Sequence, residues 1–217
     1  MFKIKKQMIL PNKEEFDGFK SIPGAFSVTE CIALINICAE APQGIYLELG
    51  THKGKSAYAA VYSLKPGAFN LVDPIFKDEE LAKKVQRFVA NATEKMIFCP
   101  TIADESLNVI PQFKDLAYVF VDSAAHDDMV MEEVKLLEDR VVQNGIIAFH
   151  DYLNQFTAVE RAYKYLLSTG KYEEIKIDWQ PIFDYVKEHN LEEGNNSWHQ
   201  YPELPHPPNF VGAVKRK

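Results

Sequence analysis

Short apolar runs alternate with amphipathic segments along most of the chain. The apolar runs predict strands at residues 45–49, 69–72, 96–99, 116–121, 146–149, 172–177 and 210–214. Apolar positions at helical spacing predict helices from Ser27 to the stop at Pro42, at residues 55–64, 78–91, 127–142 and 156–168, and a short one ending at Ile110. Buried strands that alternate with helices indicate an α/β protein with a parallel sheet covered on both faces.

Both ends of the chain depart from this alternation. Residues 1–26 are weakly patterned, so we interpret them as a leader ahead of a single domain at residues 27–217. Apart from a helical piece near residues 184–189, no convincing helix separates the last two strands, and we expect these strands to pair antiparallel. The stretch at residues 179–208 is rich in proline, asparagine and aromatic residues and predicts a long loop.

Composition and charge exclude several classes of protein. The net charge of −7 argues against general affinity for nucleic acid, which needs a basic surface. No apolar run approaches the length of a membrane span. The three cysteines are odd in number and lack metal-ligand spacing, so we expect reduced thiols and a cytoplasmic location. A homo-oligomer remains possible.

The stretch ELGTHKGKS, from Glu48 to Ser56, joins the first predicted strand to a helix. Glycines such as Gly50 and Gly54 let the chain turn tightly and let a ligand approach the backbone, beside free N–H groups at the helix start. Three residues beginning with Thr51 separate the two glycines, so neither a dinucleotide fingerprint nor a phosphate-binding P-loop is present. Because Glu48 would repel a phosphate, a cationic or amino-bearing ligand fits better.

Polar residues also follow the other predicted strands. They are Asp73 after the second, Asp104, Glu105 and Ser106 after the third, Asp122 after the fourth, and His150 and Asp151 after the fifth. Any one acid has roughly even odds of being an ordinary cap or turn residue. Acids at the ends of the first, second, fourth and fifth strands are together harder to explain in that way, because ligands of open α/β sheets bind at this edge.

Together these motifs resemble the class I S-adenosylmethionine-dependent methyltransferases, over residues 27–178. Residues 48–56 are similar to the E-x-G-x-x-x-G-x-S loop of catechol-type O-methyltransferases, and NGIIAFHDY at residues 144–152 is similar to the G-G-x-x-x-x-H-D-Y ending of the macrocin type. The resemblance implies a Rossmann-like doubly wound sheet, mostly parallel with an antiparallel last strand. It also implies transfer of a methyl group to a hydroxyl of a small molecule, such as a sugar or a hydroxylated natural product.

The resemblance further implies roles for individual residues. The cofactor-binding residues would be Glu48, Gly50, Thr51, Gly54 and Ser56 near the methionine part, Asp73 at the ribose, Asp104, Glu105 and Ser106 near the adenine, and Asp122 near the amino group. Asp122 and Asp151 would bind Mg²⁺, and His150 would join them in catalysis, with His126 as another candidate base. Residues 179–208 would form a lid over the acceptor; a surface excursion or an oligomer contact is the alternative.

Three departures from the family pattern keep other functions open. His126 lies one place later than the pattern has it, Tyr152 replaces an amide that helps to hold the ion, and Asn144 replaces the first glycine of a pair. A protein that binds S-adenosylmethionine without catalysis would tolerate such changes. A nucleotide-dependent oxidoreductase is a third alternative, but the missing G-x-G-x-x-G motif and the antiparallel finish count against it.

Overall fold

A single mixed sheet forms the centre of the molecule in a computed structural model of the chain. The structure describes residues 2–3, 8–11, 13–23, 26–92, 97–123, 128–152, 157–191 and 211–217. Within these residues the strands are β1 (Phe2–Lys3), β2 (Ile45–Leu49), β3 (Gly67–Val72), β4 (Ile97–Phe98), β5 (Thr101–Ile102), β6 (Leu116–Val121), β7 (Val141–Phe149), β8 (Tyr172–Lys176) and β9 (Gly212–Arg216).

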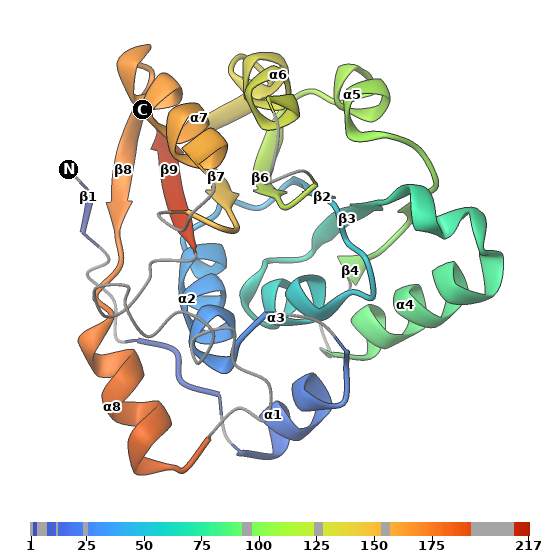
Figure 1. The fold of residues 1–217 in the computed structure, drawn as a ribbon, viewed down its shortest axis with the longest axis vertical. Helices are drawn as coiled ribbons and strands as arrows, with labels where there is room; N and C mark the ends of the chain where they lie inside the picture. The colour runs from blue at the N-terminus through green and yellow to red at the C-terminus, as the bar shows by residue number, and fades with distance from the viewer. Residues whose placement is uncertain are drawn as a thin grey trace.

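The order of the strands is β1-β8-β9-β7-β6-β2-β3-β4, and β5 also pairs with β3. All pairings are parallel except those of β9, which runs antiparallel to both β7 and β8. In Figure 1 the red strand β9 lies between β7 and β8, although it follows β8 in the sequence. The prediction of a mostly parallel, doubly wound sheet with an antiparallel last strand is therefore confirmed.

Helices cover both faces of this sheet. They are α1 (Lys13–Lys20), α2 (Val28–Ala39), α3 (Lys55–Ser63), α4 (Glu79–Asn91), α5 (Ser106–Val109), α6 (Met129–Leu137), α7 (Thr157–Ser168) and α8 (Gln180–Glu188), with 3₁₀ turns η1 (Pro74–Lys77) and η2 (Ile110–Gln112). Side chains alternate along each strand, so Tyr118 and Phe120 join the core under α1–α4 and α8, whereas Val119 and Val121 join the core under α5–α7. No described helix is both long and apolar enough to cross a bilayer.

The boundary between α6 and β7 differs from the prediction. We expected a helix through Val142, but α6 ends at Leu137 and β7 begins at Val141. Two adjacent β-branched residues favour the strand, and the backbone N–H of Leu116 donates to the carbonyl of Arg140 at the start of the pairing. Asn144 adopts φ +64°, a left-handed conformation that asparagine tolerates, which explains how it replaces a glycine there.

The prediction that residues 1–26 form a loose leader is wrong for the part that the structure describes. Helix α1 buries Phe16 and Phe19 in the core, and β1 pairs with β8. The Asn36 side chain holds the backbone of Ile9 by two hydrogen bonds, of 2.9 and 3.0 Å. Two phenylalanines in an eight-residue helix were too short a pattern to be recognised as amphipathic.

The predicted loop at residues 179–208 begins as a helix. Helix α8 contains the piece expected near residues 184–189 but starts at Gln180, and its Ile182 is fully buried. The Tyr185 hydroxyl donates to the carbonyl of Pro11 at 2.6 Å, which connects α8 to the N-terminal segment. Residues 192–210, with Trp198, His199, Tyr201 and His206, lie outside the described residues, so the lid stays a prediction.

Candidate active site

Four parallel strands end at one edge of the sheet, and backbone hydrogen bonding continues one residue beyond each of them. The backbone N–H of Gly50 donates to Val72, that of Asp122 to Leu49, and that of His150 to Val121, at 2.9–3.1 Å. The N–H of Asp73 donates to Ile102 at 3.1 Å in the same way. The expectation that polar residues from separate strands gather at one edge therefore agrees with the structure.

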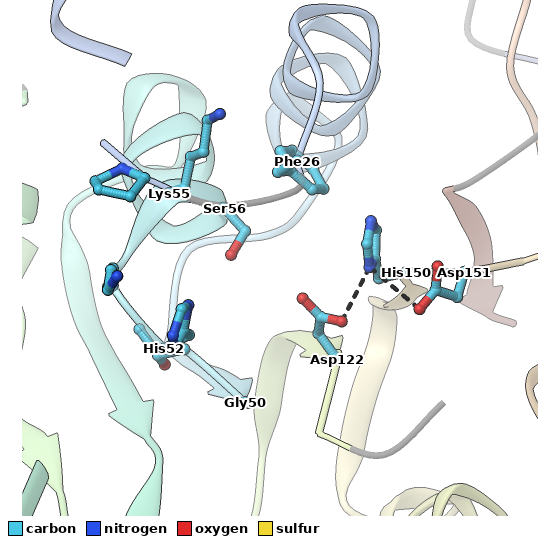
Figure 2. A pocket seen from close by; sticks show the side chains of 11 residues that line it. Phe26, Gly50, His52, Lys55, Ser56, Asp122, His150 and Asp151 are labelled. Atoms are coloured by element: carbon cyan, nitrogen blue, oxygen red, sulfur yellow. Dashed lines mark hydrogen bonds and ion pairs between the residues drawn. The ribbon is translucent and has the colours of Figure 1, made fainter. Parts of the chain in front are cut away.

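A cavity of about 260 Å³ opens at this edge. Residues 50–53, 55 and 56 line one side of it, and Asp122, His150 and Asp151 line the other. Pro23 and Phe26, from the segment that we expected to be a leader, complete the wall (Figure 2). The cavity thus joins the glycine loop to the acidic strand ends.

Gly50 is required by both conformation and space. Its φ of +85° disfavours any residue with a side chain, and a Cβ there would lie 2.4 Å from the carbonyl oxygen of Asp122. Next to it, Thr51 is only 2% exposed, and its hydroxyl has no hydrogen-bond partner among the described residues. The loop therefore packs tightly on the end of β6 while a buried hydroxyl lines the cavity.

Glu48 lies beneath this loop rather than in the cavity wall. It is fully buried, and one carboxyl oxygen accepts a hydrogen bond of 2.8 Å from the Ser56 hydroxyl. The other oxygen, Oε2, has no partner in the part of the chain that the structure describes. Burial raises the pKa of Glu48 well above its usual value, and the nearby charges of Asp122 and Asp73 raise it further. A cation placed above the loop would favour the ionised form of Glu48. The role of Glu48 in cofactor binding stays a prediction.

The Asp73 carboxylate fastens the loop to the end of β3. It accepts hydrogen bonds from the backbone N–H of His52, at 2.7 Å, and of Ile75, at 2.9 Å. Each oxygen of an ionised carboxylate has two acceptor sites, so Asp73 keeps capacity for a ligand hydroxyl. The structure thus places it beside the glycine loop, which is compatible with the predicted contact to a ribose.

The residues predicted to approach the adenine lie at the end of β5, outside the cavity lining. Asp104 accepts hydrogen bonds from the side chain of Asn108 and the backbone of Glu105, and these bonds lower its pKa. Glu105 is exposed. Ser106 is 4% exposed, and its hydroxyl has no partner among the described residues. Their contact with a cofactor stays a prediction.

His150 lies between two carboxylates. Its Nδ1 is 3.0 Å from Asp122 Oδ1, and its Nε2 is 3.1 Å from Glu30 Oε1 (Figure 2 shows the former contact). Burial lowers the pKa of His150, but Asp122 and then Glu30 overcome this effect and raise it well above its usual value. His150 therefore lines the cavity with each of its ring nitrogens against a carboxylate.

Glu30 is a residue that the sequence analysis missed. It is 1% exposed, and it closes a capping box at the start of α2 by accepting the backbone N–H of Ser27 at 2.7 Å. The spacing of Ser27 and Glu30 predicts a cap and nothing more. The second oxygen of Glu30 reaches His150, 120 residues further along the chain, and nothing in the local sequence signals that contact.

Asp122, Asp151 and His150 together could hold a metal ion. One ligand atom from each lies within 4.8 Å of the other two, and His150 Nδ1 is 3.6 Å from Asp151 Oδ2. Tyr152 does not take the place of the amide ligand of related enzymes. Its ring packs on Tyr163, with centroids 4.3 Å apart, and against Gly212. His126 lies outside the described residues, so its role as a base is untested.

Comparison with known proteins bears on the domain and on the fold. Residues 47–152 match the model of a family described as a methyltransferase domain. No curated protein sequence matches the chain. The family match indicates that residues 47–152 form a methyltransferase domain, and the fold of the chain is that of the class I S-adenosylmethionine-dependent methyltransferases.

Several solved structures share the fold at low sequence identity. A Corynebacterium glutamicum protein is 14% identical, with a TM-score of 0.57 over 94% of this chain and 87% of that one. A Bacillus cereus O-methyltransferase in complex with SAH is 13% identical, with a TM-score of 0.56 over 76% and 84%. A Streptomyces achromogenes O-methyltransferase of tomaymycin synthesis, in complex with SAM, is 13% identical, with a TM-score of 0.55 over 77% and 83%. These likenesses establish the fold and not the acceptor.

Proposed function

We propose that this methyltransferase transfers the methyl group of S-adenosylmethionine to a hydroxyl of a small molecule, with the help of a divalent cation. The observation that carries the proposal is the shared cavity, lined by the glycine loop on one side and by Asp122, His150 and Asp151 on the other. A cofactor on the loop would present its methyl group toward residues suited to activating a hydroxyl. Two fold neighbours that are O-methyltransferases support this reading.

The loop side of the cavity suits an amino acid joined to a nucleoside. Backbone N–H groups at the start of α3 and the buried hydroxyl of Thr51 can bind a carboxylate. Glu48 and Asp122 bring negative charge close to where a sulfonium and an amino group would lie. Asp73 can accept the ribose hydroxyls while it holds the loop. We assign cofactor binding to these residues together with Gly50, Gly54 and Ser56.

The other side of the cavity suits activation of an acceptor. Methyl transfer from a sulfonium is a direct displacement, so the protein mainly aligns the nucleophile with the methyl group. Asp122 and Asp151 would hold Mg²⁺, which polarises a bound hydroxyl and lowers its pKa. His150 Nδ1 lies 3.0 Å from Asp122 and 3.6 Å from Asp151, so the ring is in contact with both acids. We propose that these three residues are the catalytic group.

Binding of S-adenosylhomocysteine, measured by calorimetry, tests the cofactor part of the proposal. We expect Asp73→Asn to weaken binding about tenfold or more, because it removes negative charge next to the ribose site. Asp78→Asn is a matched control, since Asp78 also accepts two backbone N–H groups, those of Glu80 and Leu81, but at the start of α4. Absence of binding to the wild type would contradict the proposed function.

The acceptor and the metal need a separate assay. Transfer of a labelled methyl group to a panel of catechols, sugars and hydroxylated aromatic compounds, with EDTA and with added Mg²⁺, would identify the acceptor class. We expect activity with at least one hydroxyl acceptor, lost with EDTA and restored by the cation. Activity unaffected by EDTA would show that the metal part of the proposal is wrong.

We further propose that neither nucleic acid nor a membrane is a partner. The net charge of −7 supports a small acceptor. A gel-shift experiment with structured RNA should show no complex at moderate salt, and a shift at micromolar protein would contradict this part of the proposal. The cytoplasmic location and the homo-oligomer stay predictions, to be tested by fractionation and by light scattering.

A further inference from the structure

We propose that Lys55, with Phe19 and Phe26 beside it, selects acceptors in which a hydroxyl and a carboxylate lie at opposite ends of an aromatic ring. This inference rests on the proposed function and names the class of acceptor. Phe19, Pro23 and Phe26 lie outside residues 47–152, the stretch that matches the family model, so the family match assigns them no role.

A row of aromatic rings runs alongside the cavity. Measured between ring centroids, Phe26 lies 5.3 Å from His150 and 6.5 Å from Phe19. Lys55 Nζ lies 4.8 Å from the centroid of the Phe19 ring. His150, Phe26 and Lys55 all line the cavity, so its wall passes from ionisable side chains, over an apolar ring, to a lysine.

Helix α1 holds this wall in place. Its Phe16 and Phe19 are 1% and 2% exposed. A Cβ at Gly18 would lie 2.5 Å from the Tyr58 hydroxyl, so the missing side chain lets α1 approach α3, the helix that begins at Lys55. Attraction of an ammonium group to the face of a ring restricts an otherwise flexible side chain. The contact with Phe19 therefore orders the Lys55 ammonium before an acceptor binds, which lowers the entropy lost on binding.

The charges around the cavity are divided between its sides. Figure 2 shows Lys55 and Phe26 on one side of the cavity and Gly50 and Asp122 on the other. The chain has a net charge of −7, so a cation in the wall counters the general repulsion of an anionic ligand. An ammonium group has three N–H donors, so Lys55 can contact a ring and a carboxylate at the same time.

These features together describe a hydroxylated aromatic acid. Its hydroxyl would lie at the acidic end of the cavity, where the proposed function places methyl transfer. Its ring would pack on Phe26 and Pro23, which give the cavity an apolar surface, and its carboxylate would reach Lys55. The carboxylate of the cofactor has other donors, the backbone N–H groups at the start of α3 and the Thr51 hydroxyl. The experiment must therefore separate these two anions.

The test measures binding of three matched catechols by calorimetry, on the full chain saturated with S-adenosylhomocysteine and Mg²⁺. Dihydroxybenzoate, its neutral amide and dihydroxybenzylamine share the ring and both hydroxyls and differ in the charge of the third substituent. We expect the wild type to bind the acid about tenfold more tightly than the amide, and the amine most weakly. The difference between acid and amide should shrink as salt is raised from about 50 to about 500 mM.

Four variants assign the preference. Lys55→Met should bind the acid and the amide equally, and Lys55→Glu should invert the order so that the amine binds best, an effect that loss of packing alone would not produce. Phe19→Leu should reduce the preference about threefold, because Lys55 loses the ring that orders it. Lys65→Met is the matched control, since Lys65 follows the other end of α3 and donates to the carbonyl of Ala41 at 2.7 Å. It should keep the wild-type preference, and thermal unfolding establishes that each variant is folded.

Failure of this inference is distinguishable from failure of the proposed function, because every sample is first titrated with S-adenosylhomocysteine. Wild type that binds the cofactor but binds the acid no more tightly than the amide, or binds none of the three catechols, would overturn the inference alone. A preference that survives in Lys55→Met would overturn it too, and loss of cofactor binding in Lys55→Met would show that Lys55 serves the cofactor. Wild type that does not bind the cofactor would contradict the proposed function. The preference is then measured without cofactor, where its absence would overturn this inference as well.

Discussion

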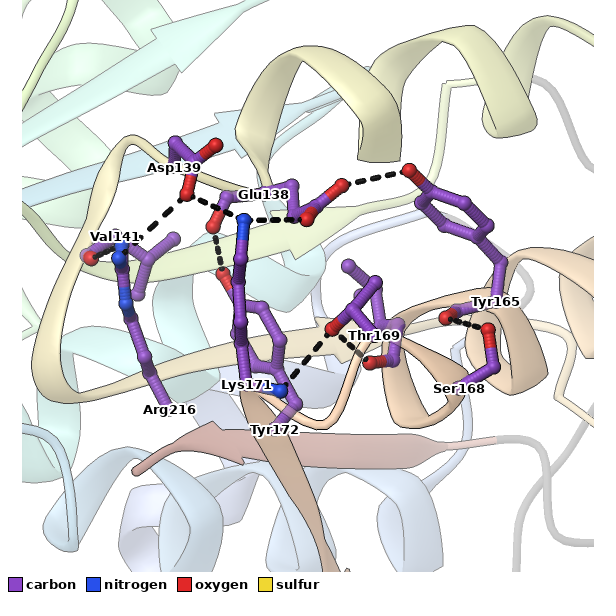
Figure 3. A network of polar contacts seen from close by, with 10 residues as sticks. Glu138, Asp139, Val141, Tyr165, Ser168, Thr169, Lys171, Tyr172 and Arg216 are labelled. Atoms are coloured by element: carbon purple, nitrogen blue, oxygen red, sulfur yellow. Dashed lines mark hydrogen bonds and ion pairs between the residues drawn. The ribbon is translucent and has the colours of Figure 1, made fainter.

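Two clusters of charged side chains lie at opposite edges of the same sheet, and they are built differently. At the edge away from the cavity, Lys171 Nζ lies 2.7 Å from Glu138 and 2.8 Å from Asp139, and Arg216 lies 3.7 Å from Asp139 (Figure 3). Two acids therefore meet two bases. Asp139 is 68% exposed and Lys171 is 41% exposed, so water screens most of these interactions.

At the cavity edge the charges are unequal and less hydrated. Among the described residues, Glu30, Asp122 and Asp151 all lie within 4 Å of a single imidazole, that of His150, whose side chain is 13% exposed. Folding alone does not favour burying such an excess of acids, because a buried charge without a partner is costly. Charge balance and burial, rather than the number of ion pairs, therefore distinguish the cluster at the cavity from the exposed one.

The largest difference between the two edges should come from replacing glycines. Gly50→Ala combines a φ of +85° with a Cβ 2.4 Å from the backbone of Asp122, whereas Gly170→Ala has a φ of +73° and open space. We expect Gly50→Ala to lower the free energy of unfolding by more than about 3 kcal/mol and Gly170→Ala by about 1 kcal/mol. Denaturant unfolding measures both. Equal losses would mean that the cavity edge is not more tightly packed.

Removing the imidazole should have the next largest effect. His150→Gln leaves Glu30 and Asp122 without the ring that contacts both of them, and removing one partner from a buried group of ionisable side chains typically costs about 3 kcal/mol. Thermal and denaturant unfolding of the metal-free protein at neutral pH would show the loss. A loss no greater than that of Lys171→Met would contradict the contrast between the two clusters.

The pH dependence of stability should distinguish the buried carboxyl group of Glu48, beneath the cavity, from the carboxyl groups of the exposed cluster. Its pKa in the folded protein is raised from a usual value of 4.5, so the folded state keeps a proton that the unfolded state has released. The free energy of unfolding of the wild type should therefore fall as pH rises above about 4.5, on the order of 1 kcal/mol for each unit of pKa difference.

Glu48→Gln removes this titration and is the variant that isolates it. We expect its stability relative to the wild type to increase as pH rises above about 4.5, measured by denaturant unfolding without ligand. Glu138→Gln provides the opposite sign, and does so below about pH 4.5, because hydrogen bonds from Lys171 and Tyr165 lower the pKa of Glu138 from its usual value. Parallel curves for the wild type and Glu48→Gln would show that burial does not shift this carboxyl group.

The smallest effect belongs to the exposed cluster. Lys171→Met should lower the melting temperature by about 3 °C or less, and the difference from the wild type should shrink as salt is raised from 50 to 500 mM. Differential scanning calorimetry at the two salt concentrations measures this. A large loss that is independent of salt would mean that this edge is also a tightly coupled, buried network.

Much of the fold followed from local pattern. Continuous apolar runs identified the central strands, and the polar residues after them met at one edge because parallel strands end on the same side. Gly50, Asp122, His150 and Asp151 were therefore predictable as neighbours. Helix α1 was not, because Phe16 and Phe19 give too short a stripe to distinguish a packed helix from a loose segment.

The contacts inside the site were less predictable. Glu30 has a complete local explanation as a capping residue, and its second contact is to a residue 120 positions away. The ring of Tyr152 turns toward Tyr163 because of how α7 packs, which a motif cannot reveal. Sequence spacing thus indicates which residues reach the edge, while packing decides which of their atoms meet.

The position of β9 has a consequence for how the protein is made. Strand β8 ends at Lys176 and β9 begins at Gly212, yet β9 lies between β7 and β8 and supplies a hydrogen-bonded neighbour to each. During synthesis on the ribosome, β7 and β8 must therefore wait with unpaired edges until the residues of β9 emerge. Exposed strand edges promote aggregation. We expect nascent chains stalled between residues 177 and 211 to be the most dependent on chaperones.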